Sequence, residues 1–141
     1  MNRLTIDDQA TILRWAGARI GIATWVPDSQ GIAEIDDEGR IVAAAIINTV
    51  QDQQAWIHIA TDGRRRWFRR DMAEMVFGFA FYELDLLRLA ARIRIDNIAS
   101  QMVALRLGFQ VEGRERAAFY GHDVAVYAML RGECPFLKEQ A

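Results

Sequence analysis

Five arginines lie within seven positions near the middle of this 141-residue chain, at Arg64, Arg65, Arg66, Arg69 and Arg70. They follow a predicted strand, Gln54–Thr61, and enter a predicted helix. The first N–H groups of a helix lack an intrahelical acceptor, and this end carries about half a positive charge, so it attracts anions. Arginines there are unfavourable unless an anion compensates them, and the planar guanidinium matches phosphate well. The cluster therefore favours a ligand that carries phosphate groups.

Two other interpretations of the arginine cluster stay open at this point. A solvated basic loop without any ligand requires no further feature of the sequence. A nucleic-acid-binding patch would require a broader basic surface with aromatic side chains on which bases stack. The chain has 17 basic and 19 acidic residues and a net charge of −2, which weighs against nucleic acid as a partner.

The composition is that of one globular domain. Hydrophobic residues make up 52% of the chain and charged residues 26%. The longest apolar run, Ile41–Ile47, is far shorter than the roughly 18 residues that a membrane span needs, so we expect no membrane association. Cys134 is the only cysteine, which excludes an internal disulfide and suits a reducing, cytoplasmic location. No repeat or linker divides residues 1–141, which we expect to form a single domain.

The first half of the chain predicts a helix followed by three antiparallel strands. Thr5 or Asp7 is the expected helix cap, with Asp7 and Asp8 in the first turn. An acidic turn that ends in Gly39 separates the apolar segments Ile32–Ile35 and Arg40–Val50, which indicates a hairpin. The third strand, Gln54–Thr61, places alternate side chains on opposite faces: Trp56, His58 and Ala60 on one, Ile57 and Ile59 on the other.

The second half alternates helices and strands. The expected elements are a long amphipathic helix from about Arg66 to Leu84, a strand at Leu89–Ile95, a helix capped by Asn97 and ended by Gly108, and strands at Phe109–Tyr120 and Val124–Leu130 joined by the turn Gly121–Asp123. This order predicts an α/β fold with a mixed, mostly antiparallel sheet and helices on both faces.

Short motifs follow the arginine cluster in a definite order. They are Ala80–Leu84, Asn97–Ser100, Gly108-Phe109 and Glu112–Arg116. In order and spacing they resemble the GNAT acetyltransferase superfamily, including members similar to ribosomal-protein N-terminal acetyltransferases. The segment from Gly121 to Cys134 is also similar to GNAT-like proteins encoded by bacteriophages. The resemblance covers about residues 55–131 and implies a single-domain GNAT fold.

This resemblance implies acetyl-CoA as co-substrate, without a metal. The family motif that binds the pyrophosphate, Gln/Arg-x-x-Gly-x-Gly/Ala, falls on Arg64, Arg65, Arg66, Trp67, Phe68 and Arg69. Since Trp67 and Arg69 replace small residues, arginine side chains are expected to take over contacts that the backbone makes elsewhere. In the family a gap beside the preceding strand holds the pantetheine and the thioester, which assigns Ile59, Ala60 and Thr61 to the cofactor. Asn97 is assigned to it as well.

His58 is the expected general base, because an unperturbed imidazole titrates near pH 6.5 and the residue lies on the strand beside the implied thioester. The alternative is a packed or surface histidine. Ala104 stands where the family often has a tyrosine that protonates the leaving thiolate, so Ser100 is expected to serve, directly or through water. A local hydrogen bond in the helix is the alternative for Ser100. Glu34 and Glu112 are further candidate bases.

Taken together, these features predict an N-acyltransferase that moves an acetyl group from acetyl-CoA to an amine of a small molecule, a protein N-terminus or a lysine. A second hypothesis is a catalytically impaired GNAT-fold binding or structural protein in a larger, phage-type assembly. Trp67, Arg69 and Ala104 support this second hypothesis. A nucleic-acid-binding module is the least favoured of the three, and a homodimer is compatible with each.

Overall fold

The computed structural model describes residues 2–64 and 69–137. Its helices and strands are β1 (Arg3–Thr5), α1 (Gln9–Ile20), β2 (Gln30–Ile35), β3 (Ile41–Gln51), β4 (Gln54–Thr61), α2 (Arg70–Gly78), β5 (Arg88–Arg94), α3 (Ile98–Leu107), β6 (Gln110–Phe119) and β7 (His122–Leu130). A π-helical turn, η1 (Phe79–Glu83), extends α2, and a 3₁₀ turn, η2 (Arg131–Glu133), follows β7. None of the helices in these residues is long and apolar enough to cross a membrane.

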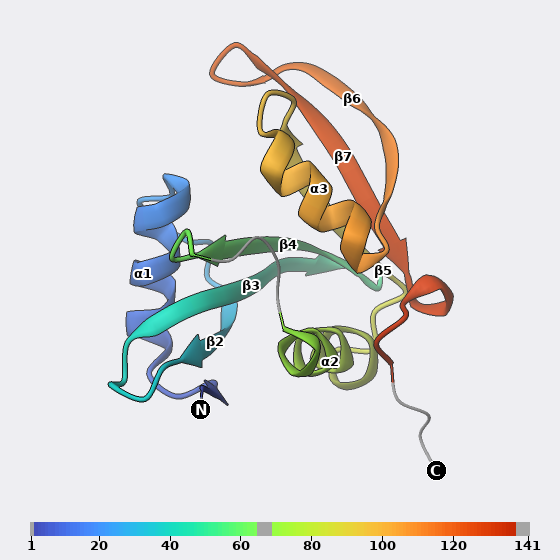
Figure 1. Cartoon of the computed structure of the whole chain (residues 1–141). Coiled ribbons are helices and arrows are strands. Elements are labelled where there is room, and N and C mark those ends of the chain that lie inside the picture. Colours follow the sequence, from blue (N-terminus) through green and yellow to red (C-terminus); the bar gives the residue numbers. More distant parts are fainter. Residues whose placement is uncertain (1, 65–68, 138–141) are drawn as a thin grey trace.

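The strands form one seven-stranded sheet in the order β1-β2-β3-β4-β5-β7-β6 within the described residues. β4 and β5 pair in parallel, and every other neighbouring pair is antiparallel. The predicted mixed, mostly antiparallel sheet is therefore confirmed. Figure 1 shows β2, β3 and β4 running together, while β6 and β7 lean away from them with α3 alongside.

Two apolar clusters place helices on opposite faces of the sheet. Ile12 and Ala16 of α1 pack with Ala44, Ile46 and Ala60. Met72, Val76 and Phe77 of α2 pack in a larger cluster with Ala43, Ala45 and Ile57, and this cluster also holds Ala104 and Leu107 of α3. Because side chains alternate across a strand, neighbours such as Ala44 and Ala45 face opposite ways. We call the first side the α1 face and the second the α2–α3 face.

Local signals predicted several element ends correctly. Gly39 takes φ +80° in the turn between β2 and β3. Asn97 caps α3 by accepting a hydrogen bond from the Ser100 backbone N–H, and Gly108 ends this helix with φ +104°. Both positive φ values suit glycine because a side chain would be strained there.

Four expectations were wrong. The first element is β1 rather than a helix, because Arg3–Thr5 pairs with Ala33–Ile35, a contact that no local pattern reveals. The cap of α1 is Asp8, whose carboxylate accepts from the Thr11 backbone N–H, so no acidic residue lies in the first turn. The α-helical part of the long helix ends at Gly78, and η1 continues it. β7 begins at His122, so the final turn is shorter than predicted.

Candidate functional site

The ladder between β4 and β5 is short. It joins Gln54, Ala55 and Trp56 to Arg88, Leu89 and Ala90. Beyond this point β5 continues its pairing with β7 as far as Arg94, whereas β4 continues with β3 as far as Thr61. The two strands therefore diverge from Ile57 onward, in the middle of the sheet.

The backbone of Ile59 points toward this divergence. The Asp62 N–H donates to the Val42 carbonyl oxygen at 2.9 Å. Because hydrogen-bonded pairs alternate along an antiparallel ladder, Ala60 and His58 also turn their backbone groups toward β3. The backbone groups of the odd-numbered residues of β4 then face β5. In agreement with this, Gln53, just before β4, accepts from the Leu87 N–H at 2.7 Å. Ile59 is thus the first residue past the end of the ladder that offers a backbone N–H on this side.

The three strand residues assigned to the cofactor differ in position. Ile59 and Thr61 direct their backbones toward the divergence, and the Thr61 hydroxyl oxygen accepts from the Gly63 N–H at 3.3 Å. Ala60 pairs with Ala44 of β3, and its side chain is buried under α1. Ile59 is consequently best placed to contact a ligand that lies between β4 and β5.

A pocket of about 290 Å³ opens on the α1 face across the divergence. It is lined by Ile22, Thr24, Trp25, Val26, Asn48, Thr49, Trp56, Ile57, His58 and Arg92. The loop after α1, the end of β3, the middle of β4 and β5 all contribute to it. The structure thus places His58 in a concave site beside the open edge of β4.

The His58 imidazole is largely enclosed. Its ring lies edge-on to the Trp25 ring, with the ring centroids 5.2 Å apart. Burial lowers the pKa of His58 below its usual value, and the positive charge of Arg92 lowers it further. The imidazole is therefore neutral at pH 7 and able to accept a proton.

Arg92 lines this pocket, although no sequence motif indicated it. Its Nε donates to the Glu115 carboxylate at 2.7 Å, and its guanidinium carbon lies 5.7 Å from the centroid of the Trp56 ring. The alternation of side chains in β5 was the signal in the sequence that could have identified Arg92. Leu89, Ala91 and Ile93 belong to the α2–α3 face. That pattern places Arg92 on the α1 face, but only the pairing of β5 with β4 brings it near His58.

Trp25 is fixed to α1 and forms one wall of the pocket. Its indole N–H donates to the Leu13 carbonyl oxygen at 2.7 Å. The loop approaches the helix closely at Gly17, where an added Cβ would lie 2.4 Å from the Ile22 carbonyl oxygen and 3.1 Å from the Trp25 indole nitrogen. Glycine at this position therefore allows the loop to dock.

We expect the Gly17→Ala variant to displace this loop and to lower the free energy of unfolding by about 1–3 kcal/mol, as overpacking does. The intrinsic tryptophan fluorescence should change along with the thermal midpoint. Gly78→Ala in α2 is the matched control, because an added Cβ there meets nothing within 4 Å. Its higher helix propensity should leave stability unchanged or slightly raised. An unperturbed Gly17→Ala protein would show that the loop does not depend on this contact.

The described members of the arginine cluster are Arg64, which follows β4, and Arg69 and Arg70 at the start of α2. Arg64 is exposed, and its guanidinium lies 3.9 Å from the Asp62 carboxylate. Arg69, which precedes the first residue of α2, approaches the buried Glu34 carboxylate at 3.6 Å and Asp71 at 2.7 Å. Arg70 lies over the Phe136 ring. The predicted cofactor residues Arg65, Arg66, Trp67 and Phe68 lie outside the described residues.

Ser100 and Asn97 lie at the start of α3, on the α2–α3 face. The Asn97 side chain accepts from the Ser100 N–H at 3.1 Å, which is a helix cap. Gln101, one helical turn after Asn97, accepts from the Tyr127 hydroxyl at 2.9 Å and donates to the Ile95 carbonyl oxygen at 2.8 Å. The two predicted catalytic residues, His58 and Ser100, are thus on opposite sides of the sheet and do not form one cluster. The other candidate bases are ion-paired, Glu34 with Arg69 and Glu112 with Arg88.

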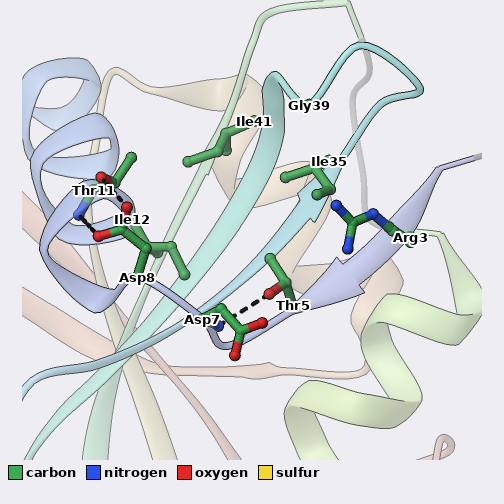
Figure 2. A pocket seen from close by; sticks show the side chains of 9 residues that line it. All are labelled: Arg3, Thr5, Asp7, Asp8, Thr11, Ile12, Ile35, Gly39 and Ile41. Atoms are coloured by element: carbon green, nitrogen blue, oxygen red, sulfur yellow. Dashed lines mark hydrogen bonds between the residues drawn. The ribbon is translucent and has the colours of Figure 1, made fainter.

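A second pocket, of about 210 Å³, lies between β1, the start of α1 and the β2–β3 hairpin (Figure 2). Its polar groups serve local structure: Asp8 accepts from the Thr11 hydroxyl at 2.7 Å, and the Asp7 N–H donates to the Thr5 hydroxyl oxygen at 3.0 Å. Within residues 2–64 and 69–137 there is no group of three or more His, Cys, Asp or Glu side chains that could hold a metal ion. The pocket across the β4–β5 divergence is therefore the stronger candidate.

Comparison with known proteins gives a consistent fold. A family model described as an acetyltransferase (GNAT) domain matches residues 23–125. No curated protein matches the sequence. Mutant forms of the spermidine/spermine N-acetyltransferase SpeG from Vibrio cholerae superpose with a TM-score of 0.77 at 13% identity, over 94% of this chain and 96% of that one. A dodecameric structure of the Vibrio cholerae spermidine N-acetyltransferase gives 0.75 at 12% identity, over 93% and 94%. Identities this low establish a shared fold alone.

Proposed function

Because the chain belongs to the GNAT family of N-acetyltransferases, we propose that it transfers an acetyl group from acetyl-CoA to a small primary amine at the divergence of β4 and β5. The observation that carries this proposal is the coincidence of two features at one point of the sheet. The backbone N–H of Ile59 faces the open edge of β4, and the neighbouring side chain, His58, faces a pocket on the α1 face. The structural neighbours are spermidine N-acetyltransferases, but an identity of 13% does not identify the acceptor of this chain.

The residues present fit acetyl-CoA at two places. The N-cap residue of α2, Arg69, makes no side-chain cap hydrogen bond, so the first backbone N–H groups of this helix, before the Met72 N–H that Asp71 accepts, suit phosphate groups, and Arg64 precedes them in the sequence. The open edge of β4 offers the Ile59 N–H as a hydrogen-bond donor to the thioester carbonyl oxygen. Arg65, Arg66, Trp67 and Phe68 belong to the same proposal through the family motif. Arg69 has a different role, because its guanidinium is engaged with Glu34 and Asp71 and so holds the start of α2 to β2.

The two faces of the sheet divide the reaction between them. The cofactor would supply the acetyl group as a thioester, whose carbon–sulfur bond breaks while the acceptor nitrogen forms the amide bond. On the α1 face, neutral His58 takes the proton that the amine loses. On the α2–α3 face, Ser100 at the start of α3 is the hydroxyl proposed to protonate the departing thiolate, directly or through water. In this proposal the two predicted catalytic residues act from opposite sides of the sheet.

A thermal shift experiment tests the cofactor part of the proposal. A ligand at a hundred times its Kd stabilises a protein by about 2.7 kcal/mol, so saturating acetyl-CoA should raise the melting temperature by several degrees. Arg64→Ala should weaken acetyl-CoA binding about tenfold, because it removes charged hydrogen bonds to phosphate. Arg14→Ala, which changes an arginine on α1, is the control and should bind like the parent protein.

Thiol release in the presence of an amine panel tests the transfer itself. Release of CoA that depends on an added amine supports the proposal. Acetyl-CoA binding without turnover for any amine would favour the alternative hypothesis, a catalytically impaired GNAT-fold binding protein. Unchanged acetyl-CoA affinity of Arg64→Ala would show that the phosphates do not lie at the start of α2.

A further inference from the structure

We propose that the acceptor is a small amine that also carries a carboxylate, an amino acid or close analogue, and that Arg92 binds this carboxylate while the amine lies at His58. This inference rests on the proposed function, since it concerns the acceptor pocket of the same reaction. It concerns substrate class, which neither the fold nor the family determines.

The charges around the pocket favour an acceptor with an anionic group. None of the described residues that line it has a carboxylate, and Arg92 is the residue among them with a permanent charge. His58 is neutral at pH 7, since burial and the neighbouring Arg92 both lower its pKa. A polycationic amine would therefore enter a pocket whose described lining has no carboxylate, and Arg92, although paired with Glu115, places a guanidinium against it. An acceptor with an anionic group gains an ion pair at the same place.

The orientation of the Arg92 side chain suits the binding of a carboxylate. Glu115 accepts from its Nε at 2.7 Å, and the guanidinium lies over the Trp56 ring with 5.7 Å between the guanidinium carbon and the ring centroid. Both contacts fix the side chain, and neither uses the two terminal nitrogens. Those nitrogens are the part of the fork that donates parallel hydrogen bonds to a carboxylate. Although Glu115 pairs with its Nε, the two terminal nitrogens of Arg92 are thus left by these contacts to donate to an anion.

The size and the lining of the pocket suit a small molecule such as an amino acid. Its volume of about 290 Å³ is at the lower end of the range for small-molecule sites, which are roughly 300–1,000 Å³. The rings of Trp25 and Trp56 supply apolar walls, and Asn48 and Thr49 add polar groups at one side. The side chain of an amino acid fits these walls. Because Arg92 and His58 line the same small pocket, one small molecule can place its carboxylate at the first and its amine at the second.

The experiment compares acceptors that differ only in the anionic group. The matched pairs are phenylalanine with 2-phenylethylamine, leucine with 3-methylbutylamine, and O-phosphoethanolamine with ethanolamine, with spermidine as the polycation. We expect kcat/KM to be at least tenfold higher for the amino acid of each carboxylate pair, and lowest for spermidine. Arg92→Gln should abolish this preference, and Arg92→Lys should retain part of it. If O-phosphoethanolamine is the best acceptor, the inference that Arg92 binds a carboxylate is wrong, and Arg92 binds a phosphate group instead.

Arg94→Gln is the matched control for charge. Arg94 lies two residues along β5 on the same face as Arg92, but it is paired with Asp96 at 2.7 Å and does not line the pocket. This variant should keep the preference for amino acids. If the parent protein acetylates the partner without the anionic group equally well in each pair, or acetylates spermidine best, the inference is overturned and the proposed transfer is left intact.

Binding of the acceptor provides a readout that does not require turnover. Isothermal titration of the parent protein with phenylalanine and with 2-phenylethylamine, in the presence of CoA, should show tighter binding of phenylalanine and loss of the difference in Arg92→Gln. Equal binding of the two compounds overturns the inference even if no acetyl transfer is detected. Failure of acetyl-CoA to bind would instead remove the proposed function. The two failures are therefore distinguishable.

Discussion

The His58→Gln variant is expected to lose about 10²–10⁴-fold in kcat with the best acceptor, the range over which a positioned general base acts. Glutamine preserves much of the volume of the imidazole but cannot accept the proton of the amine. Because the His58 side chain faces the pocket and the proposed cofactor contacts lie elsewhere, acetyl-CoA should bind the variant with unchanged affinity. Steady-state kinetics and isothermal titration measure the two quantities separately.

The pH dependence of the parent enzyme follows from the direction of the pKa shift. Burial, and then the charge of Arg92, lower the pKa of His58 below its ordinary value near 6.5. The imidazole is therefore neutral at pH 7, and activity should fall only as the pH drops through this lowered pKa. The same group destabilises the fold in acid, since the unfolded chain binds its proton at a higher pH than the folded one.

The shape of this acidic limb distinguishes catalysis from packing. His58→Gln should lack the limb, whereas a variant of a residue that only shapes the pocket should keep it. Retention of both full activity and the limb in His58→Gln would exclude His58 as the base. Arg92→Gln should move the limb upward, toward the ordinary histidine value, because it removes the charge that opposes protonation. An NMR titration of the His58 ring provides the same test without substrate.

Local sequence signals predicted the elements that depend on neighbouring residues. Asn97 and Gly108 mark the two ends of α3 as expected, because a cap and a residue with positive φ act within one turn of the helix. The alternation in β4 correctly placed His58 and Ala60 opposite Ile57, because the period of a strand is fixed by its backbone. These predictions required no knowledge of which strand pairs with which.

Long-range pairings explain what the sequence did not reveal. The end of the β4–β5 ladder at Trp56 decides which backbone groups are open, and it depends on β5 following β7 instead. Arg92 enters the pocket only through that arrangement. Arg69, assigned to phosphate by its motif position, lies against Glu34 on a strand 35 residues earlier in the numbering. No spacing rule connects the members of such a pair.

The Glu34→Ala variant is expected to lower the free energy of unfolding by about 3 kcal/mol, the lower end of the range for removing one partner of a buried ion pair. Glu34 is fully buried, and its carboxylate accepts from the Asn2 amide at 2.7 Å and lies 3.6 Å from the Arg69 guanidinium. The lower end of the range applies because Arg69 is 34% exposed and retains Asp71 as a partner. Such a loss should lower the melting temperature by roughly 10 °C.

A double-mutant cycle tests whether this ion pair also organises the phosphate site. Glu34→Gln, Arg69→Ala and the double variant should be non-additive in denaturant unfolding, because the two side chains share one contact. Asp71→Ala is the control, since its exposed pair with Arg69 should contribute little. Under conditions where all variants are folded, Glu34→Gln should also weaken acetyl-CoA binding, because Arg69 immediately precedes α2. Additive effects, together with unchanged acetyl-CoA affinity, would show that the start of α2 is positioned without Glu34.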